Sequence, residues 1–104
     1  MSYRKNNISL HPKVSQSFLD DLNDYCTATS RSRRNAVIFI LKYQLNVPSI
    51  HLKDIQAVPK GNIKLDVDLP KDLIARIDLV KKELLRSRNQ LIVMMINDYL
   101  VLPF

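Results

Sequence analysis

The 104-residue sequence has one glycine, one cysteine and two histidines, and these scarcities exclude several kinds of site. With Gly61 as the only glycine, a glycine-rich loop that cradles phosphate cannot be built. With Cys26 as the only cysteine, no disulfide can form within the chain. His11 and His51 lack metal-ligand spacing to Cys26, so we expect no metal site and no other cofactor.

Long apolar runs are also missing. The longest, Ala36–Leu41 and Leu91–Ile96, are far too short to cross a bilayer. No apolar core of a signal peptide follows the polar segment Met1–Asn7. We therefore expect a cytoplasmic protein with no membrane partner. No arrangement of a nucleophile beside a base stands out, so we do not expect an enzyme.

Acidic residues are fewer than basic ones, 10 against 16, which gives a net charge of +6. A basic balance favours an anionic partner, either nucleic acid or a lipid surface. The excess is uneven, because residues 1–48 hold seven basic and three acidic residues and the remainder holds nine and seven. Hydrophobic residues make up 46% of the chain, which is enough for a folded protein.

The main organising feature is an internal repeat. A shift of 55 residues lays residues 7–48 on residues 62–103 without a gap, and the tripeptide Arg31–Arg33 then falls on Arg86–Arg88. The apolar positions of the two segments also coincide. We divide the chain into a basic N-terminal arm (1–6), a first motif (7–46), a linker (47–61) and a second motif (62–104). The apolar residues of the linker indicate that it packs down on the fold: Ile50, Leu52, Ile55 and Val58.

Each repeat has the same local pattern. Apolar and polar residues alternate over residues 8–14 and 63–69, which predicts strands with one wet face, and Pro12 requires an edge or a local distortion. Ser15, Ser32 and Ser87 are candidate N-caps, and Pro70 suits a first helical turn. Helical spacing of apolar residues predicts helices near 15–28, 33–46, 70–84 and 88–101.

One repeat of about 40 residues rarely buries enough surface to fold alone. Its strand would have two open edges, and its second helix is apolar nearly all round in its first half, so it must be buried on several sides. The two repeats therefore have to interlock. We predict a mostly helical α+β fold in which four helices back a two-stranded antiparallel ribbon.

This pattern resembles the ribbon-helix-helix family, the fold of the Met and Arc repressors. The second repeat carries the resemblance through Ile63–Leu73, which includes the Leu-Pro helix start, and through Leu85–Arg88 and Leu91–Leu100. The first repeat matches through Val14–Phe18 and Ser30–Arg33. Most members carry one motif per chain and dimerise, whereas this chain carries two.

The resemblance implies double-stranded DNA as the partner, with the ribbon in the major groove. The implied base-contacting residues are the outward positions of the strands: Ser9, His11, Lys13, Lys64, Asp66 and Asp68. The implied phosphate-contacting residues lie at the starts of the second helices: Arg31, Ser32, Arg33, Arg34, Arg86, Ser87, Arg88 and Asn89. The arm adds Tyr3, Arg4 and Lys5 as possible contacts. The two aspartates face phosphate repulsion, so we expect them to tune the ribbon, for example by pairing with His11 or a lysine.

Two ribbon arrangements are open, one within a chain and one between equivalent strands of two chains. In an antiparallel ribbon centred on His11 and Asp66, the residue numbers of each cross-strand pair add to 77, so Ser9 lies opposite Asp68. Pairing the second repeat with itself would oppose Asp66 to Asp66, which is unfavourable. We therefore predict an intramolecular ribbon, with modules bound side by side on a longer DNA site.

The expected function is a sequence-specific transcriptional regulator, and in particular a repressor that occludes a promoter. The alternatives are the antitoxin of a toxin–antitoxin pair, a sequence-neutral architectural DNA-binding protein, and an interaction module that does not bind DNA. Antitoxins of this family usually add a disordered toxin-binding tail, which we do not expect here. A small two-motif chain also resembles regulators encoded by viral or mobile genomes.

Overall fold

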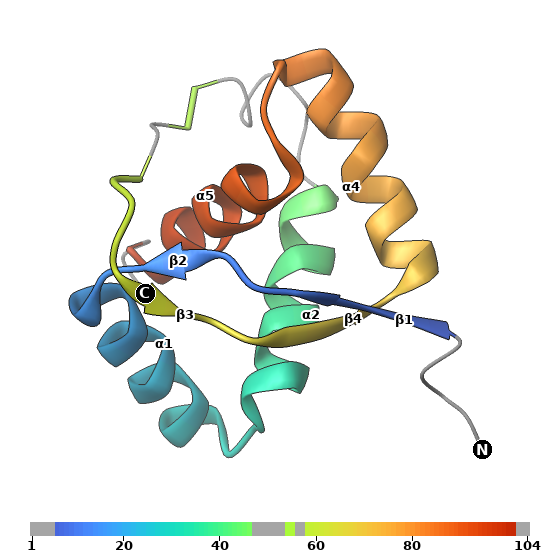
Figure 1. Ribbon diagram of the computed structural model, residues 1–104. Coiled ribbons are helices and arrows are strands. Elements are labelled where there is room, and N and C mark those ends of the chain that lie inside the picture. Colours follow the sequence, from blue (N-terminus) through green and yellow to red (C-terminus); the bar gives the residue numbers. More distant parts are fainter. Residues whose placement is uncertain (1–5, 47–53, 56–57, 102–104) are drawn as a thin grey trace.

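The computed structural model of the chain describes residues 6–46, 54–55 and 58–101. In chain order the elements are β1 (Asn7–Leu10), β2 (Lys13–Val14), α1 (Gln16–Thr29), α2 (Arg33–Leu45), β3 (Ile63–Lys64), β4 (Val67–Pro70), α4 (Lys71–Leu84) and α5 (Arg88–Leu100) (Figure 1). The predicted mostly helical α+β class is confirmed, and each of these helices begins and ends within one residue of its predicted bounds.

The strands form a ribbon in the predicted register. β1 pairs antiparallel with β4 and β2 with β3, and the numbers of the paired residues add to 77 throughout. Each predicted strand is divided in two, because Pro12 has no N–H to donate to the ladder. The backbone N–H of Leu65 still donates to the carbonyl of Pro12 at 2.8 Å, so the ribbon runs on across the interruption.

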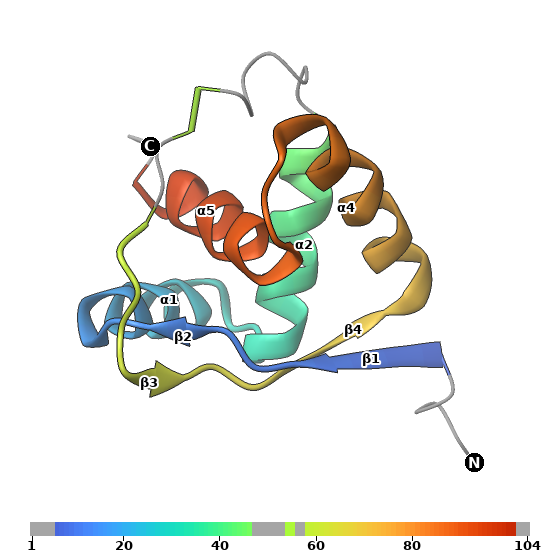
Figure 2. The same ribbon diagram turned by 45° about the horizontal axis from the view of Figure 1, so that its top comes forward.

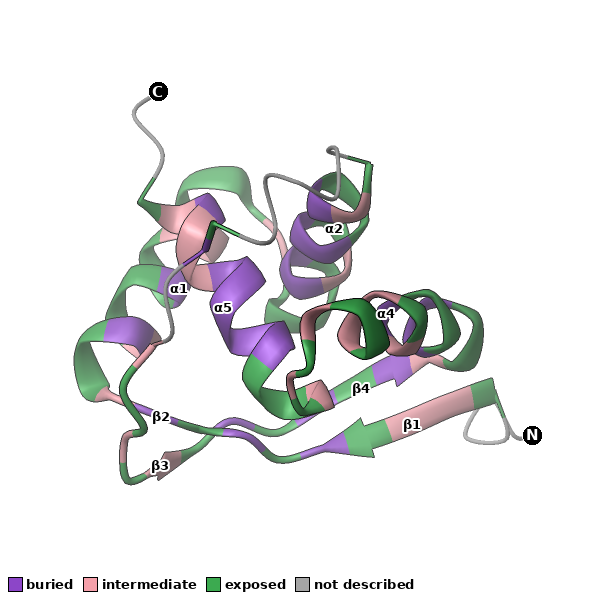
Figure 3. Ribbon diagram, turned by 90° about the horizontal axis from the view of Figure 1, so that it is seen from above, coloured by how far each residue is buried: buried purple, intermediate pink, exposed green. Residues whose placement is uncertain are grey.

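One face of the ribbon is buried and the other is exposed. Leu10 and Val14 on the first strand and Leu65, Val67 and Leu69 on the second are buried. Pro12 is buried on the same face, and the alternate residues His11, Lys13, Asp66 and Asp68 are exposed, as the period of two in a strand requires. Figure 3 shows the helices on one side of the ribbon, so none of the described helices covers its polar face.

The 55-residue repeat is present in the backbone as well as in the sequence. α4 begins and ends 55 residues after α1, and α5 begins and ends 55 residues after α2. The chain leaves α1 at Ser30 and α4 at Leu85, and both residues have the same positive φ of 55°. The two halves of the molecule therefore have the same order of elements, with strand segments followed by two helices.

Side-chain capping sets where three of the helices begin. Ser15, Ser32 and Ser87 each accept a hydrogen bond from the backbone N–H three residues ahead, at 3.1, 3.2 and 3.1 Å. Pro70 differs from its prediction: it ends β4 and is the N-cap of α4, with Lys71 as the first helical residue. Its fixed φ is compatible with the extended conformation found there, and it supplies no side-chain cap.

The core lies between the ribbon and the two central helices, α2 and α5. In α5 the whole segment Leu91–Ile96 is buried, including Met94 and Met95, as predicted. In α2 the corresponding run is buried on several sides, as predicted, but Phe39 is 40% exposed, so this helix is less completely covered than α5. Cys26 is half-buried against the core, and burial raises the pKa of its thiol.

Part of the linker packs on this core. Ile55 is buried and Val58 is half-buried against the same cluster, which agrees with a linker that packs down. Ile50 and Leu52, predicted to do the same, lie outside the described residues.

Candidate nucleic-acid interface

The exposed face of the ribbon carries the six side chains predicted to contact bases: Ser9, His11, Lys13, Lys64, Asp66 and Asp68. Two hydrogen bonds cross the ribbon on this face. Ser9 Oγ donates to Asp68 Oδ1 at 2.5 Å, and His11 Nδ1 lies 2.7 Å from Asp66 Oδ1. The prediction that Asp66 pairs with His11 is confirmed. Both aspartates are thus held by residues of the first strand.

The lysines of this face are differently placed. Lys13 and Lys64 oppose each other across the ribbon, and both are exposed. In the part of the chain that the structure describes, neither ammonium has an acidic partner. Two like charges in direct opposition repel each other, so an anionic ligand lying over this end of the ribbon would be attracted to both.

The start of α2 lies against the other end of the ribbon. Arg34 Nε donates to the backbone carbonyl of Asp68 at 3.1 Å, and its Nη2 donates to Asn7 Oδ1 at 3.3 Å. Both contacts join α2 to the paired strands β1 and β4. The amino end of this helix, with its positive dipole end, is therefore fixed beside the polar face.

The other two arginines at this helix start have different surroundings. Arg33 is exposed, and its Nη2 donates one hydrogen bond, at 3.1 Å, to the side-chain amide oxygen of Asn23 on α1. Arg31 lies over the ring of Phe39, 4.0 Å from its centroid, and donates to Tyr25 Oη at 3.4 Å. This cation–π contact was not predicted from the sequence, and it engages the guanidinium of Arg31 with the protein itself.

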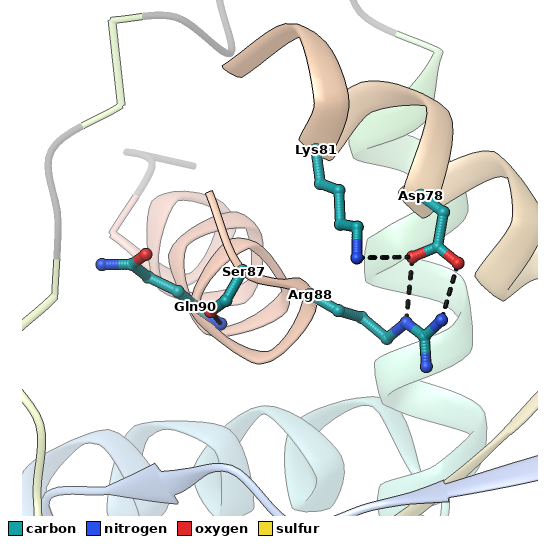
Figure 4. A network of polar contacts seen from close by, with 5 residues as sticks. All are labelled: Asp78, Lys81, Ser87, Arg88 and Gln90. Atoms are coloured by element: carbon teal, nitrogen blue, oxygen red, sulfur yellow. Dashed lines mark hydrogen bonds and ion pairs between the residues drawn. The ribbon is translucent and has the colours of Figure 1, made fainter. Parts of the chain in front are cut away.

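The equivalent arginine of the second half is bound to a carboxylate. Arg88 Nε and Nη2 donate to the two oxygens of Asp78 at 2.9 and 2.6 Å, and Lys81 Nζ lies 3.8 Å from the same side chain. Figure 4 shows Arg88 reaching from the start of α5 to Asp78 on α4. The Arg88 hydrogen bonds lower the pKa of Asp78, and the same hydrogen bonds raise the pKa of Arg88.

A cavity of about 410 Å³ lies at the end of the ribbon nearer α5. Residues 11–13 of the first strand, residues 58–60 of the linker and the start of α5 line it. Ser87 and Asn89, both predicted phosphate contacts, belong to this lining. The start of α5 therefore faces His11 and Lys13 across this cavity, whereas the start of α2 contacts Asn7 and Asp68 directly.

The remaining predicted residues are less informative. Arg86 is half-buried in the turn between α4 and α5, and Ser32 caps α2 in an exposed position. Tyr3, Arg4 and Lys5 lie outside the described residues.

Asn23 and Asp78 were not selected from the sequence, although each contacts a selected arginine. The signal that would have found them is the repeat itself, because the shift of 55 residues places Asn23 on Asp78.

Among residues 6–46, 54–55 and 58–101, no group of histidine, cysteine, aspartate and glutamate side chains is arranged to hold a metal ion. No helix in those ranges is long and apolar enough to cross a membrane.

Comparison of the chain with protein-family models, curated proteins and solved structures found no match.

Proposed function

We propose that the chain is a sequence-specific double-stranded DNA-binding protein of the ribbon-helix-helix type, and that it regulates transcription as a repressor. The observation that carries the proposal is the uncovered polar face of the two-stranded ribbon, which has a helix start beside each of its ends. The major groove of B-DNA, about 12 Å wide, admits a two-stranded ribbon and displays a distinct donor and acceptor pattern for each base pair.

Within this proposal the side chains of the polar face divide into two groups. Lys13 and Lys64 have no acidic partner among the described residues and can donate to guanine. His11 and Ser9 have partners across the ribbon, Asp66 and Asp68, which orient them. The aspartates then act mainly through their neighbours, because a free carboxylate at the groove would repel phosphate.

Phosphate binding supplies the part of the affinity that does not depend on sequence. The arginines at the start of α2 are suited to it, since Arg33 is exposed and Arg34 is fixed at the edge of the ribbon. A single module covers only a short stretch of DNA, so we propose that two or more bind side by side on a longer operator.

The test is selection of bound sequences from a random pool of DNA duplexes, followed by measurement of affinity for the selected and for random duplexes at several salt concentrations. A sequence-specific regulator binds the selected site roughly 10³-fold or more tightly than random DNA. Equal affinity for both would indicate a sequence-neutral architectural protein instead. No binding to any duplex at low salt would refute DNA binding altogether and leave a protein-interaction module.

A further inference from the structure

The two halves of the molecule differ at one pair of equivalent positions. The 55-residue shift relates Arg33 to Arg88 and Asn23 to Asp78. In both halves the arginine at the start of the second helix reaches back to this residue of the first helix. The contact is therefore repeated, but the group that receives it is an amide in one half and a carboxylate in the other.

This difference decides what each guanidinium can still bind. Asp78 takes two N–H groups of Arg88 in a bidentate pair, which is the geometry that a phosphate would otherwise occupy. A phosphate approaching Arg88 would have to displace the carboxylate, and it would also meet its negative charge. Asn23 takes one N–H group of Arg33 and carries no charge, so the charge of Arg33 stays uncompensated by its neighbour.

The next position along each helix adds to the same difference between the two halves, because it also favours phosphate binding at the start of α2. Arg34 in the first half is replaced by Asn89 in the second half. The start of α2 thus presents two arginines without an acidic side-chain partner in the described structure, whereas the start of α5 presents one arginine that is already paired.

We propose that the module holds the DNA backbone asymmetrically: Arg33 binds a phosphate on one side of the site, and Asp78 withholds Arg88 from the equivalent phosphate on the other side. This inference rests on the proposed DNA-binding function. It makes Asp78 and Asn23 positioning residues that set the orientation of the pseudo-symmetric module on its site. The favoured site then has strong backbone contacts at one end only.

Exchanging the two residues tests the proposal. We expect Asn23→Asp to pair Arg33 and to reduce the slope of log affinity against log salt by about one unit. We expect Asp78→Asn to release Arg88 and to steepen that slope by about one unit. The double exchange should restore the wild-type slope while moving the strong contact to the other end of the site, which phosphate-ethylation interference on a selected duplex would map.

Charge-matched controls separate this effect from a change in net charge. Lys42→Ala removes one positive charge in the last turn of α2, at the end away from the ribbon (Figure 2). Asp54→Asn removes one negative charge from an exposed residue of the linker. Neither control should change the slope by a full unit or change the phosphate map. Thermal melts show whether each variant is folded at the temperature of the binding assay, so that binding is compared only between folded proteins.

The outcomes are distinct. Phosphate contacts of equal strength at both ends in the wild type would overturn the asymmetry, and so would Asn23→Asp and Asp78→Asn slopes no different from their controls. Both results leave DNA binding itself intact. Failure of the wild type to bind any duplex would overturn the proposed function and this inference together.

Discussion

Substitution of the single glycine tests how closely the ribbon end is packed. A Cβ atom added at Gly61 would lie well inside 3.0 Å of three backbone atoms, the carbonyl carbon and oxygen of Val14 and the nitrogen of Ser15. Gly61 does not have a positive φ, so its role here is close approach and not an unusual backbone conformation. Gly61→Ala therefore brings a methyl group against main chain that a rotamer change cannot move aside.

The cost follows from what must shift to make room. Val14 is buried and pairs with Ile63, so moving its carbonyl disturbs the pairing of β2 with β3 and the start of α1. Overpacking typically costs about 1–3 kcal/mol, and contact with backbone places this case at about 3 kcal/mol or more. At about 4–8 °C per kcal/mol for a chain of this size, the melting temperature should fall by about 12–24 °C.

Circular dichroism during heating, together with urea titration, measures this loss. Asn62→Ala is the matched control, because Asn62 is the exposed neighbour of Gly61, and we expect it to change stability by no more than about 0.5 kcal/mol. A Gly61→Ala protein that melts within 2 °C or so of the control would show that residues 58–61 and the end of β2 separate at little cost. The packing described for this end of the ribbon would then be incorrect.

Three further predictions concern charge and recognition. Arg33→Ala should weaken binding about equally on selected and random DNA, and it should lower the slope of log affinity against log salt by about one unit. An unchanged slope would show that Arg33 does not contact a phosphate. The double variant His11→Ala/Lys13→Ala should lose more selectivity between base pairs than Asp66→Ala, because a good base contact is worth roughly 1–3 kcal/mol. Unchanged selectivity in the double variant would contradict base contacts from the first strand. The hydrogen bonds from Arg88 hold the pKa of Asp78 below its ordinary value of 3.8. The ion pair therefore stabilises the fold at pH values above 3.8, and this stabilisation is lost as the pH falls through the lowered pKa. Asp78→Asn should therefore cost roughly 0.2–1 kcal/mol at pH 7 and progressively less in acid, as urea titrations at pH 7 and below pH 4 would measure.

Much of the fold follows from features that are local in sequence. Capping serines, alternating strands and the 55-residue repeat are each visible over a few residues, and the structure has helix bounds close to those expected from them. Pairing within one chain was predictable because self-pairing of the second repeat would set Asp66 opposite Asp66, whereas the ribbon found here sets it opposite His11. A one-residue slip would also turn the apolar face of one strand outward.

The contacts that differ between the halves were not predictable in this way. Whether Arg88 meets Asp78 depends on how two helices pack, which no local pattern specifies. The exposure of Phe39 is similar, since an apolar run indicates burial but does not say which side of the helix is left open. That side is occupied in part by the guanidinium of Arg31.

Both strands of the ribbon belong to one polypeptide, and this has a consequence at low concentration. A ribbon made from two identical chains exists only while the chains remain associated, so its stability depends on how much protein is present. Here β1 meets β4, and β2 meets β3, through a unimolecular step. The exposed polar face of the ribbon is therefore complete in each molecule at any dilution.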